Sequence, residues 1–457
     1  MWWGVWNWLL LASMFQVAEQ QAKKLSCPCD TYEKCLPVND WHDYDREIFI
    51  VTEGNSDYMQ WMWESVTTVV TTGIHRTDLM CYAHAKSNKY GFIELVPDEL
   101  NTSKAEFQNW LKNVTDKVED YFADVVVFDF TKLLGNCEYA EEHVEHLLTV
   151  THTVVNSTRH LVRPVKVACV MPWMPPCFGK ECGYINNING YCDAIILNPE
   201  SYLTYCSGLM CTAQATVPLT KLIIGIDEYV TAGWPEKKII MGIPWHGYKF
   251  KCKNYRESSF GRSVCELPKI MDGNITTDKC DFENSKEKMS LGTIHKQNPN
   301  WLVSDRNYDM VYNAPYHILR NQSNNSDVYQ VWFEDVESFT AKYKIVDQFK
   351  LKGLIVYTGD DLSYTKIDID TVFNTGMWAW MLHSVLATGT ENEYKSNIYA
   401  NYPAKIAGIG VGMFFLGFVL SFIIACVVFR RKKLNKPFQK DLKDTVQDEY
   451  FDEDNTL

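Results

Sequence analysis

Short apolar runs, rich in β-branched and aromatic residues, recur along the chain and alternate with longer stretches of helical periodicity. Runs of this composition are typical of strands that are buried on both faces of a sheet. The pattern predicts eight strands, at residues 47–52, 65–70, 90–96, 124–131, 165–171, 194–197, 239–242 and 354–357.

Helical patterns lie between these strands. Ser103 and Glu106 form a capping-box sequence, in which each side chain satisfies an unpaired backbone amide at the start of a helix. Apolar residues at helical spacing follow from Phe107 to Tyr121, and a second helix is expected over residues 139–155. Strands that alternate with helices pair in parallel, so the pattern indicates an α/β fold, a (β/α)8 TIM barrel.

The connection between the seventh and eighth predicted strands is unusually long. Residues 245–352 exceed what one loop and helix require, so we expect an insertion between strands 7 and 8 of the barrel. Residues 360–388 then carry apolar positions at helical spacing, which predicts a closing helix.

Two apolar segments lie outside this pattern. Residues 1–22 are rich in Trp and Leu and are interpreted as a secretory signal peptide, with an uncleaved anchor as the alternative. Residues 406–429 carry no charge, are long enough to cross a bilayer and precede a basic cluster at residues 430–433. We interpret them as a transmembrane helix, with a buried core helix as the alternative.

These segments define the predicted organisation: a signal peptide (1–22), a barrel domain (23–390), a stalk (391–405), a transmembrane helix (406–429) and a cytoplasmic tail (430–457). The expected localisation is that of a single-pass type I protein with a lumenal or extracellular barrel, at the plasma membrane by default, with other endomembranes as the alternative. Gly408 and Gly412 form a small-xxx-small pattern that could support a homodimer within the membrane.

Composition narrows the possible partners. The net charge of −13 argues against nucleic-acid binding, which needs a basic surface. Of the 15 Cys, only Cys426 lies in the second apolar segment, and the even number that remains is compatible with disulfides, with zinc ligation as the alternative. Sequons for N-glycosylation occur at Asn101, Asn113, Asn156, Asn274, Asn321 and Asn324.

Several short blocks in register carry a resemblance to a known family. They are Cys27-Pro28-Cys29, Met80-Cys81-Tyr82-Ala83-His84, Met241-Gly242-Ile243-Pro244-Trp245-His246-Gly247-Tyr248 and Gln330-Val331-Trp332-Phe333-Glu334-Asp335. Over residues 27–388 the chain resembles the family 18 glycoside hydrolases, and within them the di-N-acetylchitobiase branch. The resemblance implies a barrel that binds N-acetylglucosamine-containing glycans, without a metal ion or a cofactor.

The resemblance also implies where the chemistry lies. The fourth strand of the family reads D-G-x-D-x-D-x-E, in which the Glu protonates the leaving oxygen and the preceding Asp orients the substrate's N-acetyl group. At the matching positions this chain has Asp124, Val127, Asp129 and Thr131. Thr131 has no proton to donate near neutral pH, so the pattern predicts that the catalytic acid is lost. Asp129 is then either a remnant of the site or a structural residue.

Other positions of the implied sugar cleft depart from the family or leave their role open. The sixth strand of the family ends M-x-Y-D, and its Tyr bonds the N-acetyl oxygen; here Pro199 takes the place of that Tyr and Glu200 the place of the Asp. Tyr357 replaces a Trp at the end of the eighth strand. Trp245, Tyr248 and Trp332 match family positions, where they would either line a sugar groove or pack the barrel against the insertion.

Three functions remain open at this stage. The first is a catalytically inactive surface protein that serves as a recognition or adhesion module for a protein partner. The second is a lectin-like binder of N-acetylglucosamine-containing glycans. The third is a weak or altered hydrolase with its acid supplied from elsewhere, for example by Glu200.

Overall fold

The computed structural model of the protein describes residues 27–38, 46–54, 57–97, 103–131, 141–159, 161, 163–175, 190–198, 211–257, 263–272, 275–294, 301–321, 327–364 and 374–379. The chain divides into two compact units, Met1–Thr388 and Gly389–Leu457, and all described residues belong to the first.

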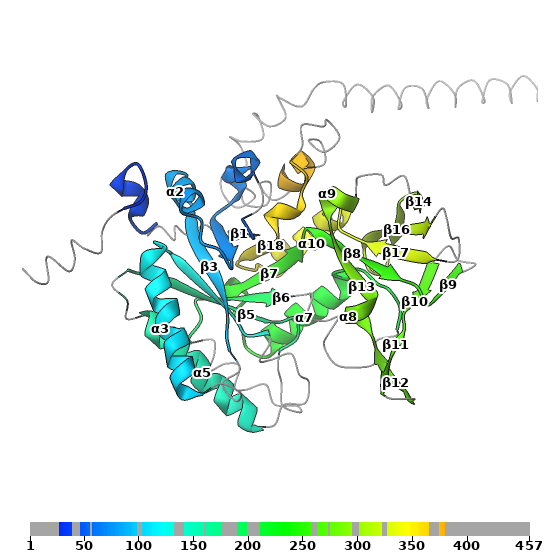
Figure 1. Ribbon diagram of the computed structural model, residues 1–457, viewed down its shortest axis with the longest axis horizontal. Helices are drawn as coiled ribbons and strands as arrows, with labels where there is room; N and C mark the ends of the chain where they lie inside the picture. Colours follow the sequence, from blue (N-terminus) through cyan, green and yellow to red (C-terminus); the bar gives the residue numbers. More distant parts are fainter. Residues whose placement is uncertain are drawn as a thin grey trace, which may run out of the picture. The chain divides into compact units, whose positions relative to one another are not determined.

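Eight parallel strands close into a barrel, which confirms the predicted fold (Figure 1). Around the barrel the order is β1-β18-β7-β6-β5-β4-β3-β2. Their bounds are Glu47–Thr52 (β1), Thr68–Thr72 (β2), Lys89–Leu95 (β3), Val125–Asp129 (β4), Lys166–Pro172 (β5), Ala194–Asn198 (β6), Ile239–Pro244 (β7) and Gly353–Tyr357 (β18).

The barrel closes between its first and last strands. Glu47 of β1 pairs with Gly353 of β18. A side chain at position 353 would collide with the backbone carbonyl of Glu47, so this close approach requires glycine. The second strand was predicted to start at Ser65, but β2 starts at Thr68. Ser65 instead ends a short 3-10 helix, η3 (Trp63–Ser65), in which Trp63 is buried.

Helices cover the outside of the barrel. They are α2 (Thr77–Ala85), α3 (Lys104–Asp120), α5 (Glu141–Arg159), α7 (Leu219–Thr231) and α10 (Val336–Gln348). The capping box that begins α3 is present as predicted, with Ser103 and Glu106 bonded reciprocally. The predicted closing helix is wrong at its start: Asp360 lies in the 3-10 helix η6 (Gly359–Asp361), whereas residues 374–379 are helical.

The expected insertion lies between β7 and β18 and is rich in strands, to one side of the barrel in Figure 1. Its main sheet has the order β13-β8-β17-β16-β14, and β15 also pairs with β16. Its elements are β8 (His246–Lys251), β9 (Asn254–Glu257), β10 (Ser263–Glu266), β11 (Lys269–Asp272), β12 (Ile275–Cys280), α8 (Phe282–Ser285), β13 (Lys286–Ser290), α9 (Leu291–Ile294), β14 (Trp301–Val303), β15 (Asn307–Asp309), β16 (Ala314–Asn321) and β17 (Val328–Trp332).

The described residues contain no helix with the length and low polarity that a membrane crossing requires. This finding contradicts the predicted localisation as a single-pass type I membrane protein, since that prediction depends on such a helix. Residues 406–429, on which it rested, lie outside the described part of the chain, as do Gly408, Gly412 and the predicted signal peptide, stalk and tail.

Disulfides are present, as the cysteine content suggested. Within the described residues they join Cys27 to Cys35, Cys29 to Cys81, Cys169 to Cys192, Cys211 to Cys280 and Cys252 to Cys265. Bonds of this kind persist in oxidising surroundings.

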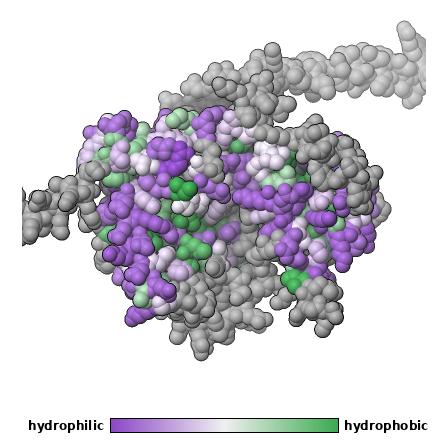
Figure 2. Space-filling view, viewed as in Figure 1, coloured by the Kyte–Doolittle hydropathy of each residue, from purple (hydrophilic) through white to green (hydrophobic). Residues whose placement is uncertain are grey.

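On the face drawn in Figure 2, the coloured residues are mostly hydrophilic, with small hydrophobic patches among them. Two of the glycosylation sequons lie on exposed helical positions, Asn113 on α3 and Asn156 on α5. Asn321 ends β16, and the remaining sequon residues, Asn101, Asn274 and Asn324, lie outside the described residues.

Candidate functional site

The inside of the barrel below the candidate site is apolar. Side chains along a strand alternate between its two faces, so Val125, Val127 and Asp129 of β4 point the same way. Val125 and Val127 belong to the cluster that fills the barrel. Asp129 therefore ends this inward row at the carboxyl end of β4, the end at which barrel proteins place their functional residues.

Thr131 engages the carboxylate of Asp129 directly. The Thr131 hydroxyl donates to Asp129 Oδ1 at 2.6 Å, and the Thr131 amide donates to the same oxygen at 2.8 Å. Burial raises the pKa of Asp129, and the two bonds from Thr131 oppose that rise only in part. The two bonds from Thr131 hold the Asp129 carboxylate in one orientation.

The first Asp of the motif lies at the opposite end of the barrel and has structural partners. Asp124 is 3% exposed and precedes β4. Its carboxylate accepts from Arg163 Nη2 at 2.9 Å and from the amides of Val38 and Tyr90, and it lies 2.8 Å from His84 Nε2. Asp124 thus ties β3, β4 and the N-terminal segment together.

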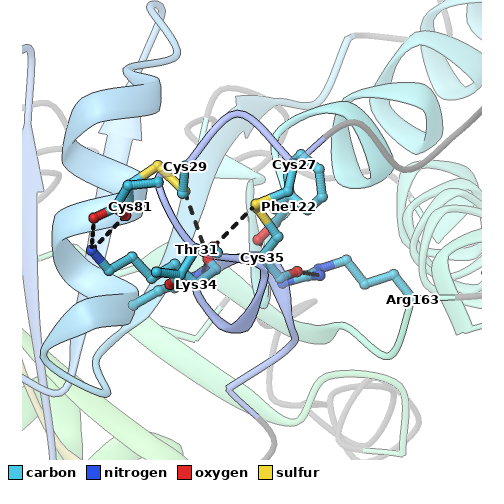
Figure 3. Close-up of a disulfide and its surroundings, with 10 residues drawn as sticks. Cys27, Cys29, Thr31, Lys34, Cys35, Cys81, Phe122 and Arg163 are labelled. Atoms are coloured by element: carbon cyan, nitrogen blue, oxygen red, sulfur yellow. Dashed lines mark hydrogen bonds and ion pairs between the residues drawn. A yellow bond between two sulfur atoms is a disulfide. The ribbon is translucent and has the colours of Figure 1, made fainter.

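The N-terminal segment is fixed to this end of the barrel by covalent and polar bonds (Figure 3). Its 3-10 helix η1 (Tyr32–Cys35) is held by the Cys27–Cys35 and Cys29–Cys81 disulfides. Arg163 Nη1 donates to the carbonyl of Cys35 at 2.9 Å. The Arg163 guanidinium therefore joins η1 to Asp124. This structural role explains why the buried Arg163–Asp124 ion pair lies far from the barrel mouth.

One further predicted site residue lies at the end of a barrel strand. Tyr357 is the last residue of β18, is partly buried and packs against the barrel interior. It pairs with Pro244 of β7. Pro199 and Glu200 follow Asn198, the partly buried last residue of β6, but lie outside the described residues.

Trp245, Tyr248 and Trp332 are buried against the protein. Trp245 is fully buried, and its ring meets that of Trp378 edge-on at 5.0 Å. Trp332 is 2% exposed, lies 4.5 Å from the ring of Tyr316 and donates its indole N–H to Gln330. Tyr248 packs in the same cluster of the insertion. Of the predicted cleft residues that the structure describes, only Asp129 and Tyr357 are thus partly exposed at strand ends.

Sequence reasoning missed a group of polar residues beside Tyr357. Asp360 accepts from the Thr52 hydroxyl at 2.8 Å and the Glu53 amide at 2.7 Å, which joins η6 to the end of β1. Asp361 accepts from the Thr358 amide and lies 3.4 Å from His246 Nδ1. The signal in the sequence was a pair of consecutive Asp residues close behind a strand, after Thr358 and Gly359.

The pKa of Asp361 reflects this environment. Burial would raise it, but the hydrogen bond with His246 and the charge of Lys288 hold the pKa below its ordinary value. Asp361 is therefore an ionised partner for the insertion, since both His246 and Lys288 belong to it.

The cluster of potential metal ligands in the described residues cannot bind a metal ion. Among the described residues, Cys27, Cys29 and Cys35 are the group close enough to share an ion. All three are oxidised in disulfides and so offer no thiolate.

The fold and the site define a (β/α)8 barrel protein with an inserted sheet and a carboxylate at the carboxyl end of its fourth strand, the end at which such barrels place their functional residues. Residues 86–361 match the family described as Glycosyl hydrolases family 18. The chain belongs to this family.

Individual relatives agree with that assignment. The chain is 24% identical to di-N-acetylchitobiase of Homo sapiens over 354 residues, covering 77% of this chain and 87% of the human protein. It is 25% identical to di-N-acetylchitobiase of Mus musculus over 357 residues, covering 77% of this chain and 92% of the mouse protein.

Solved structures show the same fold. A chitinase from Rhizomucor miehei superposes with a TM-score of 0.52 at 15% identity, over 73% of this chain and 100% of that one. A class V chitinase from Nicotiana tobaccum in complex with NAG4 also superposes with a TM-score of 0.52, at 10% identity, over 74% of this chain and 98% of that one.

Proposed function

We propose that this protein is a catalytically inactive member of family 18 that serves as a recognition module for a protein partner. The observation that carries the proposal is the contact between Thr131 and Asp129. Where the resemblance to the family places the proton donor, the chain has a hydroxyl that donates to Asp129 Oδ1.

The chemistry supports loss of hydrolysis. A positioned proton donor typically contributes ~10²–10⁴ in rate, and a Thr hydroxyl is too weak an acid to replace it. Val127 lies in the apolar barrel interior, so Asp129 also lacks a neighbouring carboxylate below it on β4. Without that second charge, the orienting role of the Asp in the family pattern is weakened as well.

The burial of the large aromatic residues Trp245 and Trp332 favours a protein partner over a glycan. Sugar sites present aromatic faces to the ligand, but Trp245 and Trp332 are buried at 0% and 2% exposure. Their rings are already packed against Trp378 and Tyr316. They therefore stabilise the junction of barrel and insertion.

The relatives' name gives the substrate on which to test the proposal, di-N-acetylchitobiose. We expect the purified protein to release no N-acetylglucosamine above a buffer control. Thr131→Glu should restore little, because Val127 and Pro199 depart from the family pattern too. Turnover by the unmodified protein would refute the proposal, and full recovery from the single change would show that the other two positions matter less than we infer.

A second candidate function is lectin-like binding of N-acetylglucosamine-containing glycans. It is favoured by Asp129 and Tyr357, which remain partly exposed at the ends of β4 and β18. Titration calorimetry with N-acetylglucosamine oligomers separates the two functions. Saturable heat that Tyr357→Ala abolishes would establish the lectin, whereas the proposal of a protein partner expects no heat.

A further inference from the structure

An open groove lies on the outside of the molecule between the insertion and α10. Its volume is ≈ 740 Å³. One wall carries Arg306, Tyr308 and Met310, which alternate along and beside β15 and so point to one face. The other wall is the side of α10 that carries Val336 and Ala341. The lining of this groove includes none of Asp129, Thr131 and Tyr357, the described residues of the candidate site at the barrel mouth.

The rim of the groove is unusually apolar. The turn from β15 to β16 exposes Met310 at 80% and Val311 at 57%. Turn tips normally carry polar residues, and large apolar side chains gathered at an exposed position mark interaction surfaces. Val336 and Ala341 extend this apolar surface along the groove and are only partly buried. The middle of the groove therefore suits a large apolar side chain.

One end of the groove is acidic. Arg306 donates to Asp335 at 2.7 Å and to Glu337 at 2.6 Å, but the Glu337 side chain remains 64% exposed. Burial, together with the charges of Glu337, Asp335 and Glu334, raises the pKa of Tyr308 to about 12. Arg306 carries one positive charge, whereas Asp335 and Glu337 carry two negative charges. This end of the groove therefore favours a positively charged group on a ligand.

The other end of the groove is basic. Lys344 is exposed and lies seven residues after Glu337 on the same helix. At 1.5 Å per residue this separates the two charges by about 10 Å along the helix axis. The α10 groove thus has an acidic end, an apolar middle and a basic end.

We propose that the α10 groove binds a segment of a partner protein that presents a basic residue, a large apolar side chain and an acidic residue in line. In an extended segment, residues four apart span about 13 Å, which is enough to reach both ends. Hydrolysis of a sugar by this protein would refute the proposed function and leave this inference untouched.

Fluorescence polarisation with short labelled peptides tests the inference. The probe is Lys-Gly-Leu-Gly-Glu, and its comparisons are Lys-Gly-Leu-Gly-Lys, Glu-Gly-Leu-Gly-Glu and Lys-Gly-Gly-Gly-Glu. We expect saturable binding of the probe below about 5 mM, and weaker binding of each comparison by about tenfold or more. No saturation of the probe, or equal binding of the peptide without Leu, would overturn the inference.

Two charge-reversal variants test whether the peptide binds in the α10 groove. Lys344→Glu makes both ends of the groove acidic, so the preference should change from the probe to Lys-Gly-Leu-Gly-Lys. Lys112→Glu, the same change at an exposed position on α3, is the matched control and should leave the preference unchanged. If Lys344→Glu left the preference unchanged, or Lys112→Glu altered it equally, the peptide would not lie in the groove and the inference would fail.

Discussion

At the scale of single residues, Asp129 and Asp124 show how one motif serves two ends of the barrel. Within the described part of the chain, Asp129 is bonded by its near neighbour Thr131, whereas Asp124 gathers partners from the N-terminal segment, α2, β3 and Arg163. The motif positions could be assigned from the sequence. The structural role of Asp124 could not, because Arg163 and His84 are distant along the chain and no local pattern links them.

The raised pKa of Asp129 has a consequence for stability. The folded state holds the Asp129 proton more tightly than the unfolded state does, so the ionised carboxyl costs stability as pH rises above its ordinary range. We expect Asp129→Asn to raise the melting temperature at pH 7, and the gain to shrink as the pH falls toward 4.

The matched control for this prediction is Asp116→Asn, at an exposed position of α3. It should change the melting temperature little at either pH. A gain for Asp129→Asn that stayed constant across the pH range would mean that its effect comes from packing and not from the charge.

At the scale of elements, the apolar runs identified the barrel strands because those strands are buried on both faces. The insertion was predicted only as a length of chain. Its strands are short and partly exposed, as in β9, where Asn254, Arg256 and Glu257 face solvent. Such strands carry no continuous apolar run, so a sequence pattern cannot separate them from loops.

The pairing of Arg163 with Asp124 joins η1, β3 and β4, and removing one partner should be costly. Both side chains are at most 7% exposed. Arg163→Met leaves a buried carboxylate without its cation, which should lower the free energy of unfolding by about 3–5 kcal/mol. Urea denaturation of the purified protein measures this loss.

An exposed ion pair provides the comparison. Glu287 is 64% exposed and pairs with Lys249 across β13 and β8. Glu287→Gln should lower the free energy of unfolding by less than about 1 kcal/mol. Equal losses for Arg163→Met and Glu287→Gln would show that the buried network around Asp124 does not stabilise the N-terminal segment.

At the scale of the whole molecule, strand number and order were predictable because alternating strands and helices have few ways to close. How the insertion packs was not predictable. Trp332 and Tyr248 lie in a second apolar cluster, with Phe250 and Tyr316, that is separate from the barrel interior. Their match to family positions was equally compatible with a sugar groove, and only their burial indicates that they pack within the protein.

The closure of β1 onto β18 determines when this barrel can be completed during synthesis. One edge of β1 pairs with β2, but the partner of its other edge is β18, which begins at Gly353, so that edge stays unpaired until nearly the whole unit has left the ribosome. Chains dominated by such distant pairings fold slowly, and their open strand edges invite misassembly in the meantime. The nascent chain is therefore expected to depend on chaperones until β18 emerges.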